Sequence, residues 1–160
     1  MSIYDAMKEH SIVLPTPTKA KGRYGMVTGF AGCYIYTAGT GCAKDGKPLI
    51  TGQLGDTVNV EQGKAAAEQC AKNILANVER AIGSLDKIKR IVKTTVFMAA
   101  TSGFKEQSAV GDGASELFKK LWGAENIGVR TAIGVSSLPG GQTVEIETIF
   151  ELKDGEELKC

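Results

Sequence analysis

The sequence lacks the features that mark several large classes of protein. It has a single histidine and no apolar run near the roughly 20 residues of a membrane-spanning helix. Residues 1–8 also lack the basic-then-apolar order of a secretory signal. The 19 Lys and Arg residues nearly balance the 18 Asp and Glu residues, so no field of one sign can hold nucleic acid or an anionic membrane. We therefore expect a cytoplasmic protein that binds neither membranes nor nucleic acid.

Cysteine is too scattered to form a metal site or a disulfide framework. The four cysteines are Cys33, Cys42, Cys70 and Cys160, and no two of them form a CxxC pair. No histidine lies near them at the spacing of zinc ligands. Cys70 falls on the apolar face of a predicted helix, where a buried thiol is the simplest interpretation. We expect no metal and no other cofactor.

Two amphipathic patterns predict helices. Over residues 60–85, apolar residues recur at steps of three and four, and Asn59 and Gln62 fit a capping box at the start. A second pattern covers about residues 110–122 and ends at Gly123. A short helix is also expected at residues 2–9, inside an N-terminal extension that covers residues 1–19.

Runs of β-branched residues predict strands between and around these helices. The predicted strands cover residues 24–30, 33–38, 88–99, 128–136 and 143–152. This order of elements predicts an α+β domain over residues 20–152, in which a mixed sheet carries both helices on one face. The other face also carries Val, Ile and Phe side chains, so we expect a homo-oligomer that buries it. Residues 153–160 are expected to form a charged tail.

Charged residues in the last two strands give the strongest functional signal. Arg130 lies in one apolar run, and Glu145 and Glu147 lie in the next. A charge in such a strand is costly to bury unless it is paired or meets a ligand. Arg130 could pair with either glutamate across the hairpin, or its fork of donors could bind a carboxylate or phosphate. The two glutamates share one face of their strand, so either could be a working carboxylate.

Several short motifs are spread over residues 20–152. They are Gly22-Arg23-Tyr24, Tyr36-Thr37-Ala38-Gly39, Asp86-Lys87-Ile88, Ile91 to Phe97, Val129-Arg130-Thr131, and Leu138-Pro139 followed by Val144 to Glu147. Taken together they resemble the RidA/YjgF family, also called endoribonuclease L-PSP or reactive-intermediate deaminases. The resemblance implies a chorismate mutase-like fold and a homotrimer with clefts between subunits. It also implies hydrolysis of enamines or imines, such as 2-aminoacrylate, to a 2-keto acid and ammonia.

The resemblance further implies roles for individual residues. Arg130 would grip the substrate carboxylate, Glu147 would place or polarise the water, and Tyr24 would complete the catalytic set. Further substrate contacts would come from Thr131, Ala132, Ala38, Gly39 and Asp112. The well-studied deaminases carry a serine, a cysteine and an asparagine where this chain has Ala38, Ala132 and Asp112. These departures remove polar contacts to the substrate and indicate a divergent subgroup.

Three functions follow as alternatives. The first is a deaminase of a small carboxylate-bearing enamine or imine. The second is a non-catalytic module that binds a small carboxylate or keto acid, which Ala38 and Ala132 favour. The third is an interaction protein with a vestigial cleft. A ribonuclease ranks lower, because metal-free RNA cleavage commonly uses histidine and the single His10 lies outside the matched region. The chain also lacks a basic stripe with interleaved aromatics.

Overall fold

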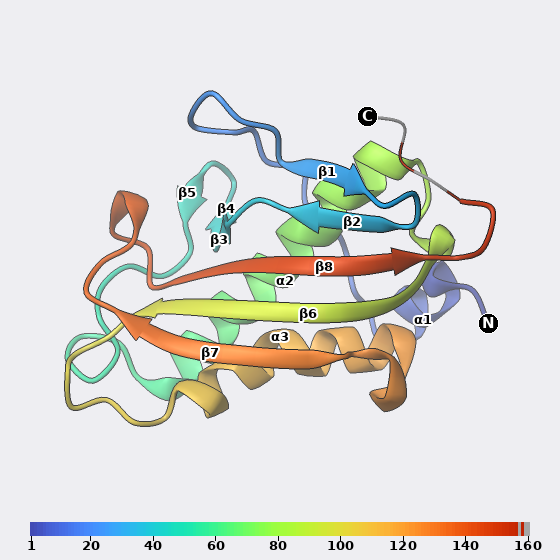
Figure 1. The fold of residues 1–160 in the computed structure, drawn as a ribbon. Coiled ribbons are helices and arrows are strands. Elements are labelled where there is room, and N and C mark those ends of the chain that lie inside the picture. The colour runs from blue at the N-terminus through green and yellow to red at the C-terminus, as the bar shows by residue number, and fades with distance from the viewer. Residues whose placement is uncertain (157, 159–160) are drawn as a thin grey trace.

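The computed structural model describes residues 1–156 and 158, and Figure 1 shows their arrangement. The helices are α1 (Ile3–Glu9), α2 (Val60–Ile82) and α3 (Gln107–Trp122), with short 3-10 helices at Leu85–Lys87, Ala124–Asn126 and Pro139–Gly141. The strands are β1 (Val27–Phe30), β2 (Tyr34–Thr37), β3 (Thr40–Gly41), β4 (Ala43–Lys44), β5 (Lys47–Pro48), β6 (Ile88–Ala99), β7 (Val129–Val135) and β8 (Val144–Leu152).

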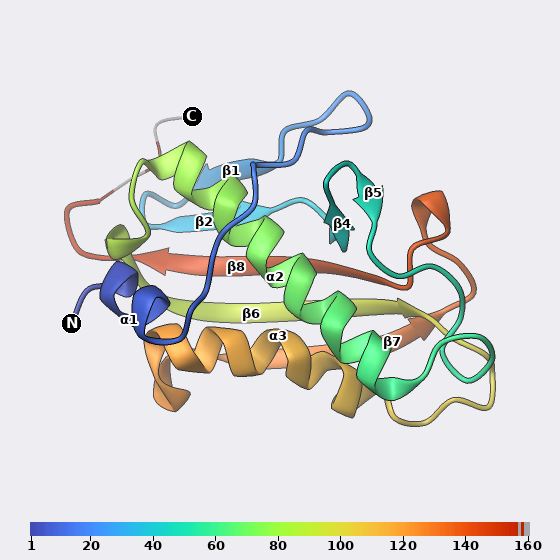
Figure 2. The same cartoon turned by 180° about the vertical axis from the view of Figure 1, so that it is seen from behind.

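The main sheet is mixed, as predicted. Its order is β1-β2-β8-β6-β7, and β3 pairs with β8 beyond the end of β2. All pairs are antiparallel except β6 and β7, which are joined through α3. A parallel connection needs a crossover of this kind, because a tight hairpin can join only antiparallel strands. Figure 2 shows α2 and α3 lying across one face of the sheet, so the predicted α+β class with both helices on one face is confirmed.

The core lies between the sheet and the two long helices. The predicted capping box at the start of α2 is present: Asn59 Oδ1 accepts from the Gln62 amide at 2.8 Å, and the Asn59 amide donates to Gln62 Oε1 at 2.9 Å. Cys70 is fully buried on the inner face of α2, as predicted. On α3, Phe118 packs edge-on against Phe150 of β8, with ring centroids 6.2 Å apart. These contacts fix the helical layer against the sheet.

Residues 3 and 153–156, near the two ends of the described chain, contact the domain at Asp86 and Lys87. The predicted N-terminal helix forms as α1, where the Ile3 amide donates to Asp86 Oδ1 at 2.6 Å. The predicted tail falls partly on residues 157 and 159–160, which lie outside the described residues. In the described part, the Lys153 amide donates to the Lys87 carbonyl at 2.9 Å, and Lys87 forms a 3.1 Å ion pair with Glu156.

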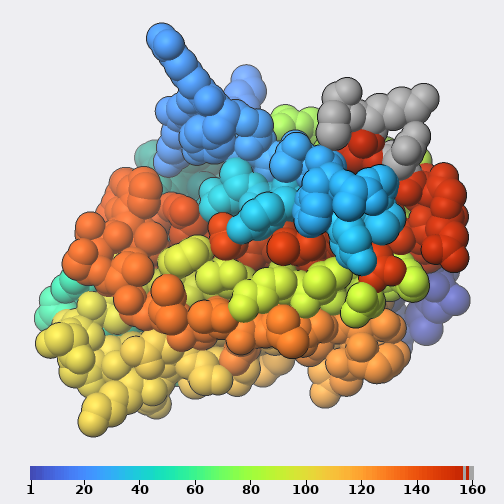
Figure 3. All heavy atoms as spheres, in the orientation of Figure 1, coloured from blue at the N-terminus to red at the C-terminus, as the bar shows by residue number. Residues whose placement is uncertain are grey.

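The sheet face opposite the helices is open in a single chain. Figure 3 views the molecule from this side. Large apolar side chains are exposed at its two edges, among them Phe30 on β1 and Val129 and Ile133 on β7. Water-exposed apolar surface of this kind is typical of a face that a partner covers. Among the described residues, no helix is long and apolar enough to cross a membrane.

Candidate functional site

Arg130 lies on β7, the edge strand, and faces the helical layer. Its parallel partner on β6 is Thr94, which is buried beneath the helices. The guanidinium reaches α3, where Nη1 donates to Asp112 Oδ1 at 2.8 Å and to Ser115 Oγ at 2.9 Å. Nη2 donates to the carbonyl and the hydroxyl of Ser108, at 3.0 and 2.9 Å. The alternative of a hairpin ion pair with Glu145 or Glu147 is therefore wrong.

The geometry of α3 explains how Arg130 lies so close to it. A Cβ atom on Gly111 would approach Arg130 Nη1 to 3.1 Å, so the glycine leaves room for the guanidinium. The Arg130 side chain keeps one-fifth of its surface exposed, and that of Asp112 keeps 47%. Arg130 and Asp112, both predicted as site residues, thus form one charged pair at the surface.

The glutamates of β8 face the other side of the sheet. Glu145 and Glu147 alternate with buried residues that point into the core, so both carboxylates lie on the open face. The register pairs Glu147 with Thr95 of β6, and Thr95 pairs with Thr131 of β7. Arg130 immediately precedes Thr131 on β7, so its side chain points to the opposite face of the sheet. One chain therefore does not bring Arg130 and either glutamate into one site.

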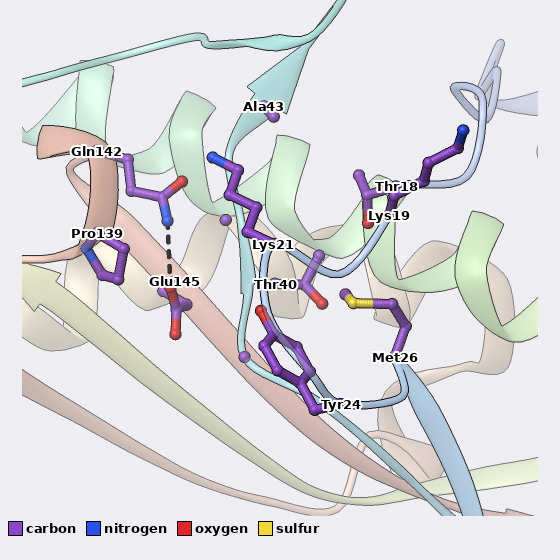
Figure 4. A pocket seen from close by; sticks show the side chains of 12 residues that line it. Thr18, Lys19, Lys21, Tyr24, Met26, Thr40, Ala43, Pro139, Gln142 and Glu145 are labelled. Atoms are coloured by element: carbon purple, nitrogen blue, oxygen red, sulfur yellow. Dashed lines mark hydrogen bonds between the residues drawn. The ribbon is translucent and has the colours of Figure 1, made fainter.

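A cavity of about 150 Å³ lies at the end of the open face, where β3 meets β8. Its lining residues come from the segment before β1, from β3 and its neighbours, and from the turn into β8, and Figure 4 shows them. They are Thr18, Lys19, Lys21, Tyr24, Met26, Gly39, Thr40, Gly41, Ala43, Pro139, Gln142 and Glu145. Two of the predicted site residues, Tyr24 and Gly39, therefore lie together here.

Glu145 is the carboxylate of this cavity. Gln142 Nε2 donates to its Oε2 at 3.1 Å, which fixes the carboxyl group beside Tyr24 (Figure 4). Burial raises the pKa of Glu145, and the charge of Glu147 raises it further, whereas the Gln142 hydrogen bond and the charge of Lys21 lower it. A carboxyl group with a raised pKa beside a cavity is typical of a proton-transfer site.

Two glycines make room for this arrangement. A Cβ atom on Gly39 would collide with Glu145 Oε1, and one on Gly41 would collide with the side-chain amide of Gln142. The motif Tyr36-Thr37-Ala38-Gly39 therefore needs glycine at its end, because any side chain at this position displaces the Glu145 carboxylate.

Glu147, the predicted catalytic glutamate, lies outside the cavity. Its carboxylate acts on the Tyr36 phenol of β2 and, together with burial, raises the pKa of Tyr36. Glu145 occupies the position beside Tyr24 instead. Alternation along the strand could not decide whether Glu145 or Glu147 is the working carboxylate. The close contact between Gly39 and Glu145 identifies Glu145 as the one at the cavity.

The other predicted contact residues do not line the cavity. Thr131 accepts a 2.7 Å hydrogen bond from Lys93 Nζ on the open face. Ala132 lies on the Arg130 side of β7 and packs partly against the core. The Ala38 amide donates to the Met26 carbonyl at 2.9 Å, and its carbonyl accepts from Thr40 Oγ1 at 3.0 Å. Ala38 therefore fixes the chain path beside Gly39.

Lys21 and Gln142 line the cavity without having been foreseen from the sequence. Neither stands in an apolar run or a metal-ligand spacing, so no pattern singles them out. His10 lies beside Lys119 and Lys120 of α3, away from the cavity lining. In the part of the chain that the structure describes, no three His, Cys, Asp or Glu residues gather as a metal site would require.

Comparisons with known proteins show the family and the fold of the chain. The family model described as endoribonuclease L-PSP matches residues 16–152. Protein TCP17 of Trypanosoma cruzi is 38% identical over 126 residues, which are 78% of each chain. A crystal structure of a protein of unknown function from Agrobacterium tumefaciens is 37% identical, with a TM-score of 0.86 and coverage of 94% of this chain and 92% of that one. A candidate endoribonuclease from Shewanella oneidensis is 25% identical, with a TM-score of 0.89 and coverage of 95% and 100%.

Proposed function

Since the chain belongs to the endoribonuclease L-PSP family, we propose that it hydrolyses small enamines and imines derived from amino acids. The products are a 2-keto acid and ammonia. The observation that carries the proposal is the cavity in which Tyr24 and the half-buried Glu145 converge. Its volume suits a metabolite of a few carbon atoms, since a cavity of about this size holds a ligand as small as benzene.

The cavity groups suit imine hydrolysis. Water adds to the C=N carbon, and Glu145 takes a proton from that water as the C–O bond forms. Glu145 then passes this proton to the nitrogen, which is already protonated in the reacting iminium form. The C–N bond breaks, ammonia leaves, and the added hydroxyl gives its remaining proton back to Glu145 as it becomes the C=O group. An enamine enters the same path after protonation at its terminal carbon. In this proposal the Tyr24 hydroxyl, which lines the same cavity, donates to the substrate, and positioning in such a site supplies much of the rate.

A second copy of the chain completes the proposed site. Glu145 and Arg130 lie on opposite faces of the sheet, so a carboxylate bound by Arg130 meets Glu145 only if the two come from different chains. The exposed apolar residues of the open face and of the β7 edge support such an assembly. The Nε–H of Arg130 has no hydrogen-bond partner among residues 1–156 and 158, which leaves a donor for a substrate carboxylate. We propose a homotrimer, as the family resemblance implies.

The direct test generates 2-aminoacrylate in situ and follows the release of ammonia and pyruvate. The proposal predicts release faster than in buffer, from 2-aminoacrylate or another amino-acid imine. No acceleration with any of several imines would contradict it. Incubation with RNA under the same conditions tests the endoribonuclease name of the family, and we expect no cleavage.

A non-catalytic binding module is the second candidate. Ala38 and Ala132 bring no side-chain polar group, and Arg130 is already engaged by Asp112 in the single chain. This alternative predicts saturable binding of pyruvate that Arg130→Ala abolishes, with no turnover of any imine.

Replacing Gly39 by alanine tests the placement of Glu145. The added Cβ collides with Glu145 Oε1, so the carboxylate must move. Misplacement of a catalytic group by about 1 Å can cost about 100-fold in rate, and we expect a loss of that order in kcat/KM for 2-aminoacrylate. Gly103→Ala is the matched control, because a Cβ there meets nothing within 4 Å. Equal activity of the two variants would show that the carboxylate position is unimportant.

A further inference from the structure

We infer that Lys21 gives the cavity a second anion-binding point, so that the preferred substrates are imines of dicarboxylic amino acids. This inference rests on the proposed function and adds a substrate class to it. It assigns a specificity role to a residue that the family motifs do not include.

Lys21 reaches into the cavity from the segment before β1. Figure 4 shows its side chain extending between Thr40 and Gln142, on the same side as the Tyr24 hydroxyl. Its Nζ lies 3.9 Å from the position that a Cβ on Gly140 would take, so the ammonium stands at the turn into β8. Lys19 also belongs to the lining, but its ammonium points away from Glu145 in this view.

The Lys21 ammonium is available for a ligand. Its charge acts on Glu145, yet the two groups form no ion pair, and no ion pair of Lys21 exists within residues 1–156 and 158. An ammonium is a compact point charge that pairs well with one carboxylate. The Lys21 ammonium, the Glu145 carboxyl group with its raised pKa and the Tyr24 phenol therefore line one cavity.

Two cations at different places select a substrate with two anionic groups. If Arg130 of a second copy binds the carboxylate next to the imine, Lys21 remains for a carboxylate at the far end of the side chain. An apolar side chain in the same place would cover the ammonium without pairing it, which is unfavourable. The substrate class that satisfies both cations is a short imino dicarboxylate.

The test compares two imines that differ only at the far end. Imines of glutamate and norvaline, generated in situ by amino acid oxidases, have the same five-carbon chain. We expect wild-type kcat/KM to be about tenfold higher for the glutamate imine, the size of one charge-assisted hydrogen bond. Lys21→Met should remove this preference and Lys21→Arg should retain it. Lys44→Met removes an exposed charge on β4 outside the cavity lining and should keep the wild-type preference.

Three results separate failure of the inference from failure of the proposed function. If the wild type hydrolyses both imines equally well, the proposed function holds and the substrate class is wrong. If Lys21→Met slows both imines equally, Lys21 binds the carboxylate next to the imine, and the inference is overturned. If neither these imines nor 2-aminoacrylate is hydrolysed, the proposed function fails. Calorimetric titration with 2-oxoglutarate and 2-oxopentanoate then tests the Lys21 subsite without turnover. Equal affinities of the protein for the two keto acids would overturn the inference.

Discussion

Glu145→Gln is expected to lower kcat/KM for 2-aminoacrylate by about 100- to 10,000-fold, the usual contribution of a general base. Glutamine keeps the shape of the side chain and can still contact Gln142, so the fold should persist. The loss should fall mainly on kcat, because in the proposed mechanism Glu145 acts on the attacking water while Arg130 of a second copy holds the substrate carboxylate. Steady-state kinetics measures the loss in kcat, and circular dichroism of the same sample checks that the fold persists.

Glu147→Gln is the matched control for this prediction. Glu147 lies two residues along the same strand, carries the same charge and acts on Tyr36 outside the cavity. Its replacement should change kcat/KM far less than that of Glu145. The reverse order of effects would assign the catalytic role to Glu147, as the family resemblance alone suggested.

The pH dependence of the wild type should also reflect Glu145. Because burial raises its pKa, the acidic limb of kcat/KM should lie above the range of an ordinary glutamate. The sign for stability follows from the same shift. A carboxyl whose pKa is raised by folding stabilises the fold below its unfolded pKa, and this contribution is lost as the pH rises through the folded pKa. The stability of Glu145→Gln relative to the wild type should therefore increase as the pH rises from the unfolded pKa of Glu145 through its folded pKa.

Phe118→Ala is expected to destabilise the fold by about 3–5 kcal/mol, the range for removing a buried aromatic ring. Phe118 on α3 is 1% exposed and contacts both Trp122 and Phe150, with ring centroids 6.3 and 6.2 Å apart. Its loss opens a cavity between α3 and the sheet, where neighbouring rings cannot fill the space without shifting. Urea unfolding at one fixed protein concentration measures the effect, since assembly of copies would make the apparent stability depend on concentration.

Phe30→Ala is the control for this change. Phe30 stacks on Tyr34 at the sheet edge and is 45% exposed, so its removal deletes a ring without opening a core cavity. We expect a loss of less than about 1 kcal/mol in the single chain, in line with surface substitutions. Equal effects of the two replacements would show that the packing of α3 on β8 does not dominate stability.

The fold was predictable where local signals are strong. The capping box of Asn59 and Gln62 set the start of α2, and the β-branched run at residues 88–99 set both ends of β6. The start of α3 was predicted three residues late, because Glu106 makes no side-chain cap bond there. Tyr24 was predicted inside a strand but precedes β1, since Val27 is the first residue that pairs with β2. Such boundaries depend on tertiary pairing.

The site was only partly predictable for a related reason. Its groups come from segments that are more than 100 residues apart, and the pairing of Thr40 with Ile146 is what brings Gly39 to Glu145. Alternation along β8 could not choose between Glu145 and Glu147. The partner of Arg130 is Asp112, which depends on how the crossover helix lies under β7. No local pattern contains that information, and none pointed to Lys21.

We propose that two chains share one site, and an experiment that mixes two variants tests this sharing. Arg130→Gln and Glu145→Gln should each be nearly inactive alone. When equal amounts are co-expressed and assemble at random, about one quarter of the sites receive an intact Arg130 from one copy and an intact Glu145 from the other. We expect mixed trimers isolated through two different tags to recover about one third of wild-type activity, because each of them has one of its three sites intact. Mixed oligomers that remain inactive at every ratio would contradict it.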